Sequence, residues 1–227
     1  MIFLLGLLVL ALILSPIFKL KKVSVYGNEN IDSEEIKNIV SSANILLLSS
    51  SELESNLLKK FPKISEIEVE KNIFKRSLSI IISERIDAGI ACKENTGNCF
   101  YFDQNGIIFE NAPRTSGYLV LSVNDFSEKI FSAGEKIYSQ ETVDSIISIK
   151  EYLDSSGKVK IDHFEITANP PKEIKAVSVK GWYILFDATR DIKKQLSMLK
   201  TALDEKIKDT ANLEYIDLTI ENRIYYK

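Results

Sequence analysis

The residues that could do chemistry in this chain are few and scattered. His163 is the only histidine among 227 residues, and it alternates in phase with Val159 and Ile161, as on a strand. We expect it in the core or on a sheet surface rather than acting as a general base. The sequence holds no nucleophile elbow, Walker loop or zinc-protease motif, and its glycines are too dispersed to cradle a phosphate. We therefore predict no catalytic, cofactor-binding or metal-binding residues, and the single Trp182 is expected in the core.

Three carboxylates share one face of a predicted strand. Glu66, Glu68 and Glu70 alternate with Ile67 and Val69, which is typical of a strand with one face in water. Such a face could bind a cation weakly. Because several lysines lie close by in the sequence, a solvated and charge-balanced surface is the ordinary interpretation.

Two cysteines, Cys92 and Cys99, are separated by six polar residues with strong turn character. They are expected to face each other across a hairpin. A disulfide that closes so short a loop would contribute about 2–3 kcal/mol in the chain-entropy model and would need an oxidising compartment. Two unpaired thiols are the alternative. A zinc site would require two further ligands, and His163 is far away in sequence.

The overall composition is that of a folded protein. Hydrophobic residues make up 45% and charged residues 27% of the chain, which is long enough for two small domains. The formal net charge is −3, with acids and bases interspersed. No basic face indicates nucleic acid as a partner.

The first 18 residues are apolar. Residues 1–18 contain no charge, and at ~1.5 Å per residue a helix of this length covers roughly 27 Å, close to the hydrocarbon core of a bilayer. We predict an uncleaved transmembrane anchor. A cleaved signal peptide is the competing interpretation, but the stretch lacks a basic first region and a small-residue cleavage site. Lys19, Lys21 and Lys22 are expected to flank the membrane.

The next region, Val23–Arg85, is predicted to fold as a β-α-α-β-β unit. Two capping boxes, Asp32 with Glu35 and Ser51 with Glu54, mark two helix starts. The strands are expected at Val23–Tyr26, Glu66–Glu70 and Leu78–Ile82. Such a unit can bury one sheet face under both helices.

The remainder of the chain alternates between strands and helices. Phe100–Phe109 reads as a hairpin around Asn105-Gly106. Helices are expected from Ser139 and from Thr189. Further strands are expected at Tyr118–Val123, Val159–Ile161, Ile174–Val179, Trp182–Phe186, Leu213–Ile220 and Arg223–Tyr226.

Several of these segments resemble the FtsQ/DivIB family of bacterial cell-division proteins, in which a POTRA domain precedes a second, β-rich domain. The matching segments are Val23–Asn28, Phe61–Val69, Ile80–Arg85, the Asp103 to Gly106 turn, the helix carrying Lys193, Lys194 and Leu196, and Tyr215–Leu218. The chain departs from the family at Phe74–Arg76 and Ile86-Asp87, where Pro is common, and at Thr219, where Arg is common.

The resemblance implies an α+β protein with three parts. These are a single transmembrane helix at 1–18, a POTRA domain at 19–86, and a mainly antiparallel β-sheet domain with flanking helices at 87–227. It implies a non-enzymatic division scaffold without cofactors. An enzyme of unrecognised type and a POTRA module of outer-membrane assembly or secretion are the alternatives, although no barrel strands follow here.

The resemblance also places a partner site at the last strands. Partners resembling FtsB and FtsL would add a strand there by β-augmentation, and other division proteins would bind the POTRA domain. The expected contact residues are Ile216, Leu218, Ile220, Asn222, Ile224, Tyr225 and Tyr226.

The orientation in the membrane is a point of conflict. The three lysines after residue 18 would keep the bulk of the chain in the cytoplasm by the positive-inside rule. The resemblance implies a cytoplasmic N-terminus and an extracytoplasmic bulk, at the septum of the plasma membrane. We follow the resemblance, because paired cysteines also favour an oxidising side.

Overall fold

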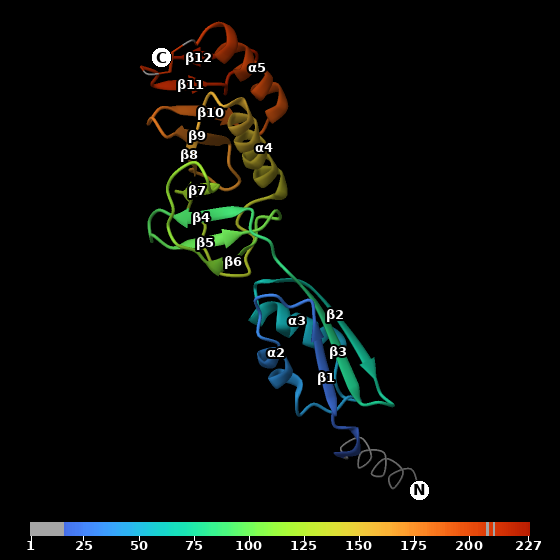
Figure 1. The fold of residues 1–227 in the computed structure, drawn as a ribbon. Helices are drawn as coiled ribbons and strands as arrows, with labels where there is room; N and C mark the ends of the chain where they lie inside the picture. The colour runs from blue at the N-terminus through green and yellow to red at the C-terminus, as the bar shows by residue number, and fades with distance from the viewer. Residues whose placement is uncertain (1–15, 208, 211) are drawn as a thin grey trace. The chain divides into compact units, whose positions relative to one another are not determined.

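The computed structural model describes residues 16–227 except 208 and 211, and the chain divides into two compact units, Met1–Arg85 and Ile86–Lys227 (Figure 1). Of the predicted anchor, residues 1–15 lie outside the described residues, and the rest forms a 3-10 turn, η1 (Pro16–Phe18). In the part of the chain that is described, no helix is both long and apolar enough to cross a membrane.

The first unit has the predicted order of elements. They are β1 (Lys22–Tyr26), α2 (Ser33–Val40), α3 (Ser50–Lys60), β2 (Ile64–Asn72) and β3 (Ser77–Glu84). The three strands lie in the order β1-β3-β2, with β1 parallel and β2 antiparallel to the central β3. Both helices lie on one face of this sheet (Figure 1).

The alternation of β2 explains its two faces. Ile67 and Val69 pack against the helices, whereas Glu66, Glu68 and Glu70 are exposed. The glutamates therefore form a solvated face of the sheet, as expected from their spacing.

Of the two predicted N-cap residues in this unit, Asp32 caps its helix and Ser51 does not. The Asp32 carboxylate accepts a hydrogen bond from the Glu34 N–H at 2.9 Å, which fixes the start of α2. The start of α3 was predicted two residues too late. Ser49 caps this helix, because its backbone is extended (φ −85°, ψ 121°) and its hydroxyl accepts from the Glu52 N–H, while Ser51 is already helical.

The second unit is built on one large sheet. Its elements are β4 (Gly89–Lys93), β5 (Cys99–Phe102), β6 (Ile108–Asn111), β7 (Ser122–Asp125), α4 (Gln140–Ser156), β8 (Ile161–Ile166), β9 (Glu173–Ser178), β10 (Tyr183–Asp187), α5 (Ile192–Glu205), β11 (Tyr215–Asp217) and β12 (Tyr225–Tyr226). The nine strands lie in the order β12-β11-β10-β9-β8-β7-β4-β5-β6.

This sheet is mixed: five of its eight strand pairs are antiparallel, as expected of a mainly antiparallel sheet, and three are parallel. The pairs β4–β7, β7–β8 and β10–β11 are parallel. Parallel neighbours need a crossover connection, and α4 and α5 provide two of these. Both helices cover the same face of the sheet (Figure 1). Inward residues of the strands, such as Phe164, Ile184 and Phe186, are fully buried beneath them.

Several predicted boundaries in this unit are wrong; the strand expected at Val159–Ile161, for example, is β8 (Ile161–Ile166). Two of the differences have identifiable reasons. The strand expected at Tyr118–Val123 is instead Ser122–Asp125, and Leu119 is 84% exposed. The polar end of β7 is buried because Lys93 neutralises Asp125. Helix α5 is capped by Asp191 rather than Thr189, whose hydroxyl donates to Asp187 instead.

Candidate partner-binding site

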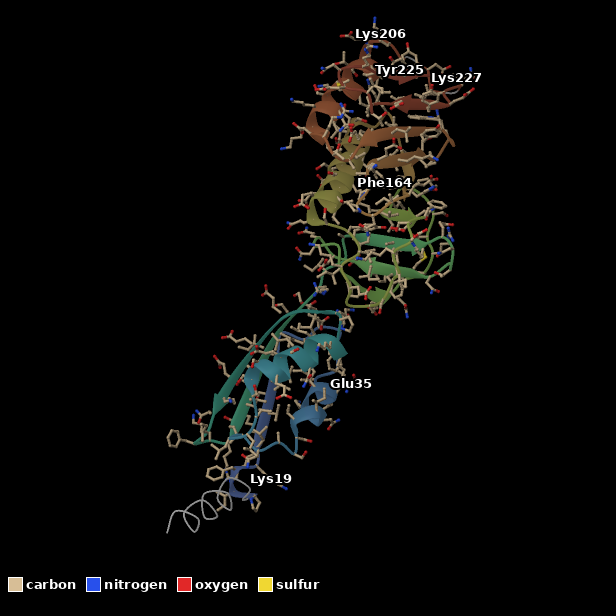
Figure 2. All side chains as sticks on the ribbon, turned by 180° about the vertical axis from the view of Figure 1, so that it is seen from behind. Lys19, Glu35, Phe164, Lys206, Tyr225 and Lys227 are labelled. Atoms are coloured by element: carbon tan, nitrogen blue, oxygen red, sulfur yellow. A yellow bond between two sulfur atoms is a disulfide. The ribbon has the colours of Figure 1, made fainter. Side chains whose placement is uncertain are left out.

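The last two strands form one edge of the large sheet. β11 is parallel to β10 on one side and antiparallel to β12 on the other, with Asp217 opposite Tyr225 and Ile216 opposite Tyr226. β12 has a neighbour on one side only. Figure 2 shows Tyr225 and Lys227 at this end of the sheet. β12 is thus an edge strand, as its place in the chain predicts.

The backbone of β12 presents hydrogen-bonding groups to the open side. Lys227 and Tyr215 exchange two hydrogen bonds, with N–H to O=C distances of 3.2 and 3.3 Å. In an antiparallel pair, bonded and non-bonded residues alternate. The backbone N–H and C=O of Tyr226, and by the same alternation those of Ile224, therefore point away from β11 and toward an added strand.

A single arginine fixes the turn that leads from β11 to β12. The Arg190 guanidinium donates to the Leu218 carbonyl at 3.0 Å and to the Thr219 carbonyl at 2.6 Å. It is held in place by the Asp187 carboxylate at 2.6 Å. Burial alone would raise the pKa of Asp187, but the bonds from Thr189 and Arg190 outweigh it and lower this pKa. The Asp187 carboxylate therefore stays ionised at neutral pH, and its ion pair with Arg190 is retained there.

The predicted contact residues separate into two groups. Ile216 and Leu218 are fully buried in the core, so their side chains cannot touch a partner, and this part of the prediction is corrected. Both belong to the core cluster that also contains the buried residues of α5. Ile220, Tyr225 and Tyr226 are 46%, 46% and 49% exposed, respectively.

The two other predicted residues shape the edge. Asn222 has a left-handed backbone (φ 57°) in the turn, a conformation that Asn tolerates well. Ile224 is partly buried against the core and pins β12 to the sheet. Of the predicted contact residues, those with exposed side chains are therefore Ile220, Asn222, Tyr225 and Tyr226.

An aromatic and charged row continues from this edge across the uncovered face. The rings of Tyr183 and Tyr215 stack with centroids 6.0 Å apart, and the Lys175 ammonium lies 4.5 Å from the Tyr183 ring centroid. Lys175 also pairs with Glu165 at 2.9 Å. Sequence reasoning missed this row and Arg190, because only the register of β8 to β11 brings these residues together.

His163 belongs to that row. Its Nδ1 lies 2.8 Å from Asp162 and its Nε2 lies 3.3 Å from Glu165. It is a sheet-surface residue between two carboxylates. Within the residues described, no three or more His, Cys, Asp or Glu side chains are grouped so that they could hold a metal ion.

The two cysteines lie at the opposite half of the sheet. Cys92 on β4 and Cys99 on β5 are directly opposite in register and are joined by a disulfide, with an S–S distance of 1.98 Å. Next to Cys92, the buried Lys93 ammonium lies 2.8 Å from the Asp125 carboxylate. Asp125 also accepts from Tyr138, and burial together with this carboxylate raises the pKa of the Tyr138 hydroxyl well above its usual value.

Comparison with known proteins identifies the first unit. Residues 18–85 match the family described as POTRA domain, FtsQ-type. Among curated proteins, the chain is similar to "Cell division protein DivIB" of Clostridium tetani (strain Massachusetts / E88). The two are 22% identical over 213 residues, which cover 90% of this chain and 77% of that protein.

Proposed function

We propose that this chain is a member of the FtsQ/DivIB family of bacterial cell-division proteins. In this proposal it is a membrane-anchored and non-enzymatic scaffold that captures a strand of a second division protein at β12. The FtsQ-type POTRA match and the similarity to DivIB over most of the chain support the division role. The same match speaks against the alternative of an outer-membrane assembly module.

The observation that carries the proposal is the open edge at β12. The strand has two residues, is flanked on one side by β11 alone, and exposes two tyrosines. Exposed edges invite another strand unless charges or bulges block them. Arg223 and Lys227 are the only charged side chains from residue 223 onward. Arg223 donates to the Tyr225 hydroxyl at 3.4 Å and Lys227 pairs with Glu214 at 3.0 Å, and both tyrosines remain about half exposed. Tyrosine supplies the large, amphipathic contact area that dominates many interfaces.

The proposed occupant is an extended segment of proteins resembling FtsB and FtsL. Backbone bonds to Tyr226 and Ile224 would supply affinity, and the side chains of Ile220 and Tyr225 would select the sequence. Residues 1–18 would hold the chain in the plasma membrane at the septum, with the bulk outside the cytoplasm. The POTRA domain would recruit other division proteins.

Capture is tested by purifying a tagged chain from its own membranes and identifying what comes with it. Tyr226→Pro removes the outward N–H without touching the Lys227–Tyr215 bonds, so we expect loss of the partner with an intact fold. Deletion of Arg223–Lys227 should do the same. Glu68→Lys, on the exposed face of β2, is the control and should leave capture unchanged. A partner retained by both edge variants would place the site elsewhere.

Orientation is tested independently by fusing alkaline phosphatase after Lys227. We expect an active enzyme, because the fusion would lie outside the cytoplasm, where the phosphatase forms its disulfides. An inactive phosphatase together with an active cytoplasmic reporter at the same position would refute the proposed topology.

A further inference from the structure

One end of the first unit combines exposed apolar side chains with basic ones. We define the basal surface as the segments Pro16–Lys22, Ser41–Leu48 and Lys71–Ser77. In Figure 1 the turn between β2 and β3 lies at the end of the unit where β1 begins, and Figure 2 places Lys19 at the same end.

Hydrogen bonds hold the three segments together. The Arg76 guanidinium donates to the Ile17 carbonyl at 2.7 Å, and the Arg76 carbonyl accepts from the Lys21 N–H at 2.8 Å. The Ile45 N–H donates to the Phe18 carbonyl at 3.0 Å. The Lys71 ammonium donates to the Leu48 carbonyl at 2.7 Å. The basal surface is therefore one structured surface rather than three separate loops.

Large apolar side chains on this surface are left in water. Phe74, at the tip of the β2–β3 turn, is 100% exposed, and Ile17 and Leu47 are 61% and 59% exposed. Leu46 and Ile73 are 40% and 47% exposed. A fully exposed phenylalanine and four exposed aliphatic side chains at one end of a small domain are the kind of apolar surface that marks an interaction site.

The charge of the basal surface is entirely positive. Its cations are Lys19, Lys21, Lys22, Lys71, Lys75 and Arg76, and its three segments contain no Asp or Glu. The nearest carboxylate in sequence is Glu70, which directly precedes the surface. Elsewhere in residues 16–85 the balance is reversed, with ten carboxylates against five cations. A unit with nearly equal numbers of acids and bases thus concentrates its positive charge at one end.

We propose that the basal surface rests on the surface of an anionic phospholipid bilayer, with Phe74 and Ile73 in the interfacial layer and the six cations at the headgroups. Basic side chains around an apolar tip match an anionic membrane in both charge and polarity. The uncharged residues 1–15 lead directly into the basal surface at Pro16, so any membrane that holds them is adjacent. In this respect the inference rests on the proposed anchor.

The test uses the full chain reconstituted in vesicles, and fluorescence reports the depth of single side chains. Phe74→Trp places a probe at the tip, and this substitution disturbs no buried contact because Phe74 is 100% exposed. Tyr26→Trp is the matched control, since Tyr26 is 56% exposed at the other end of β1. Trp182, common to both variants, is 4% exposed and gives the baseline measured on the parent chain.

In vesicles that contain phosphatidylglycerol and lipids brominated in their acyl chains, we expect the emission added at position 74 to be blue-shifted. It should also be quenched at least about threefold more strongly than the emission added at position 26. The charge reversals Lys21→Glu and Lys75→Glu should remove most of this difference, and so should high salt. The reversals Lys59→Glu and Lys60→Glu, on the exposed end of α3, should not. Equal quenching at positions 74 and 26 would overturn the proposal.

Flotation separates this proposal from the anchor. A chain that floats with neutral vesicles but shows no tip quenching in anionic vesicles keeps the anchor and refutes the basal contact. A chain that floats only with anionic vesicles, and no longer does so after the Lys21 and Lys75 reversals, refutes the anchor and supports the basal contact. A chain that floats with neither refutes both.

Discussion

Both units tie a loop to the end of an interior strand with a charged group, but they place that group at different depths. In the first unit, Glu84 at the end of β3 accepts four hydrogen bonds from Glu29, Asn30 and Ile31 in the turn before α2. In the second, Lys93 at the end of β4 pairs with Asp125 at the end of β7, and the two side chains are only 4% and 0% exposed.

The difference in burial decides how each of these interactions responds to acid and to mutation. A partly exposed carboxylate can still be solvated when its partners are lost, and it can be protonated from solvent. A buried ion pair is costly to break, because the remaining charge has neither a partner nor water. The first unit should therefore be sensitive to acid, and the second to mutation.

The largest effect is expected from Asp125→Ala. The substitution leaves Lys93 buried without its counter-charge, with only Ser127 oxygens to accept from it, and it also removes an acceptor from Tyr138. The free energy of unfolding of the second unit should therefore fall by about 3–5 kcal/mol. Urea unfolding followed by Trp182 fluorescence measures this, because the single tryptophan lies in that unit. The control is Lys158→Ala, which breaks an exposed ion pair with Asp204 and should change the stability far less. Equal losses in the two variants would show that depth does not matter here.

A smaller effect is expected from replacing both cysteines by serine. Opening the disulfide between β4 and β5 frees a short loop in the unfolded chain and should lower the stability of the second unit by about 2–3 kcal/mol. The same unfolding experiment under non-reducing conditions measures it. Adding a reductant to the wild-type chain should produce a comparable loss, and adding it to the double serine variant should produce none.

The smallest effect is expected from acid on the first unit. Burial alone would raise the pKa of Glu84, but the hydrogen bonds from Ile31, Asn30 and Glu29 outweigh it and lower this pKa to about 2. A carboxylate with a lowered folded-state pKa stabilises the fold fully above its unfolded value of about 4.3. That contribution is lost as the pH falls from about 4.3 toward 2.

Hydrogen exchange of the β3 amides should report this loss, of about 1 kcal/mol because the group is partly exposed. Glu84→Gln cannot ionise, so its β3 protection should change less over the same pH range. An acid response of equal size in the wild-type chain and the variant would assign the effect to other carboxylates.

The elements that local pattern determines were predictable. Alternation located β2 and β10, and the Cys92 to Cys99 spacing located the hairpin that joins β4 to β5. The β-α-α-β-β order of the first unit followed from two helical and three alternating segments. These features depend on neighbours in sequence, which is why they could be read from it.

The predictions that were wrong depended on contacts between residues far apart in the sequence, or on a choice between two equally suitable residues. The polar end of β7 is buried only because Lys93, 32 residues away, reaches Asp125. The cap of α3 had two serines with the same Ser-x-x-Glu spacing, and sequence could not choose between them. At the candidate site, the sequence showed that Ile216 and Leu218 share one face and Asp217 lies on the other. That Ile216 and Leu218 are buried follows from their packing in the core cluster with α5.

The order of the strands along the chain determines when, during synthesis, the β12 edge of the large sheet can form. β12 and its neighbour β11 come after the other seven strands of the sheet in the chain, and β11 reaches its place only through α5. During synthesis, the edge strand β12 is therefore the final part of the sheet to be completed. A chain that stalled on the ribosome, or was clipped near residue 210, would retain the seven earlier strands and still offer no β12. If this edge captures a partner as proposed, only finished copies of the chain can do so.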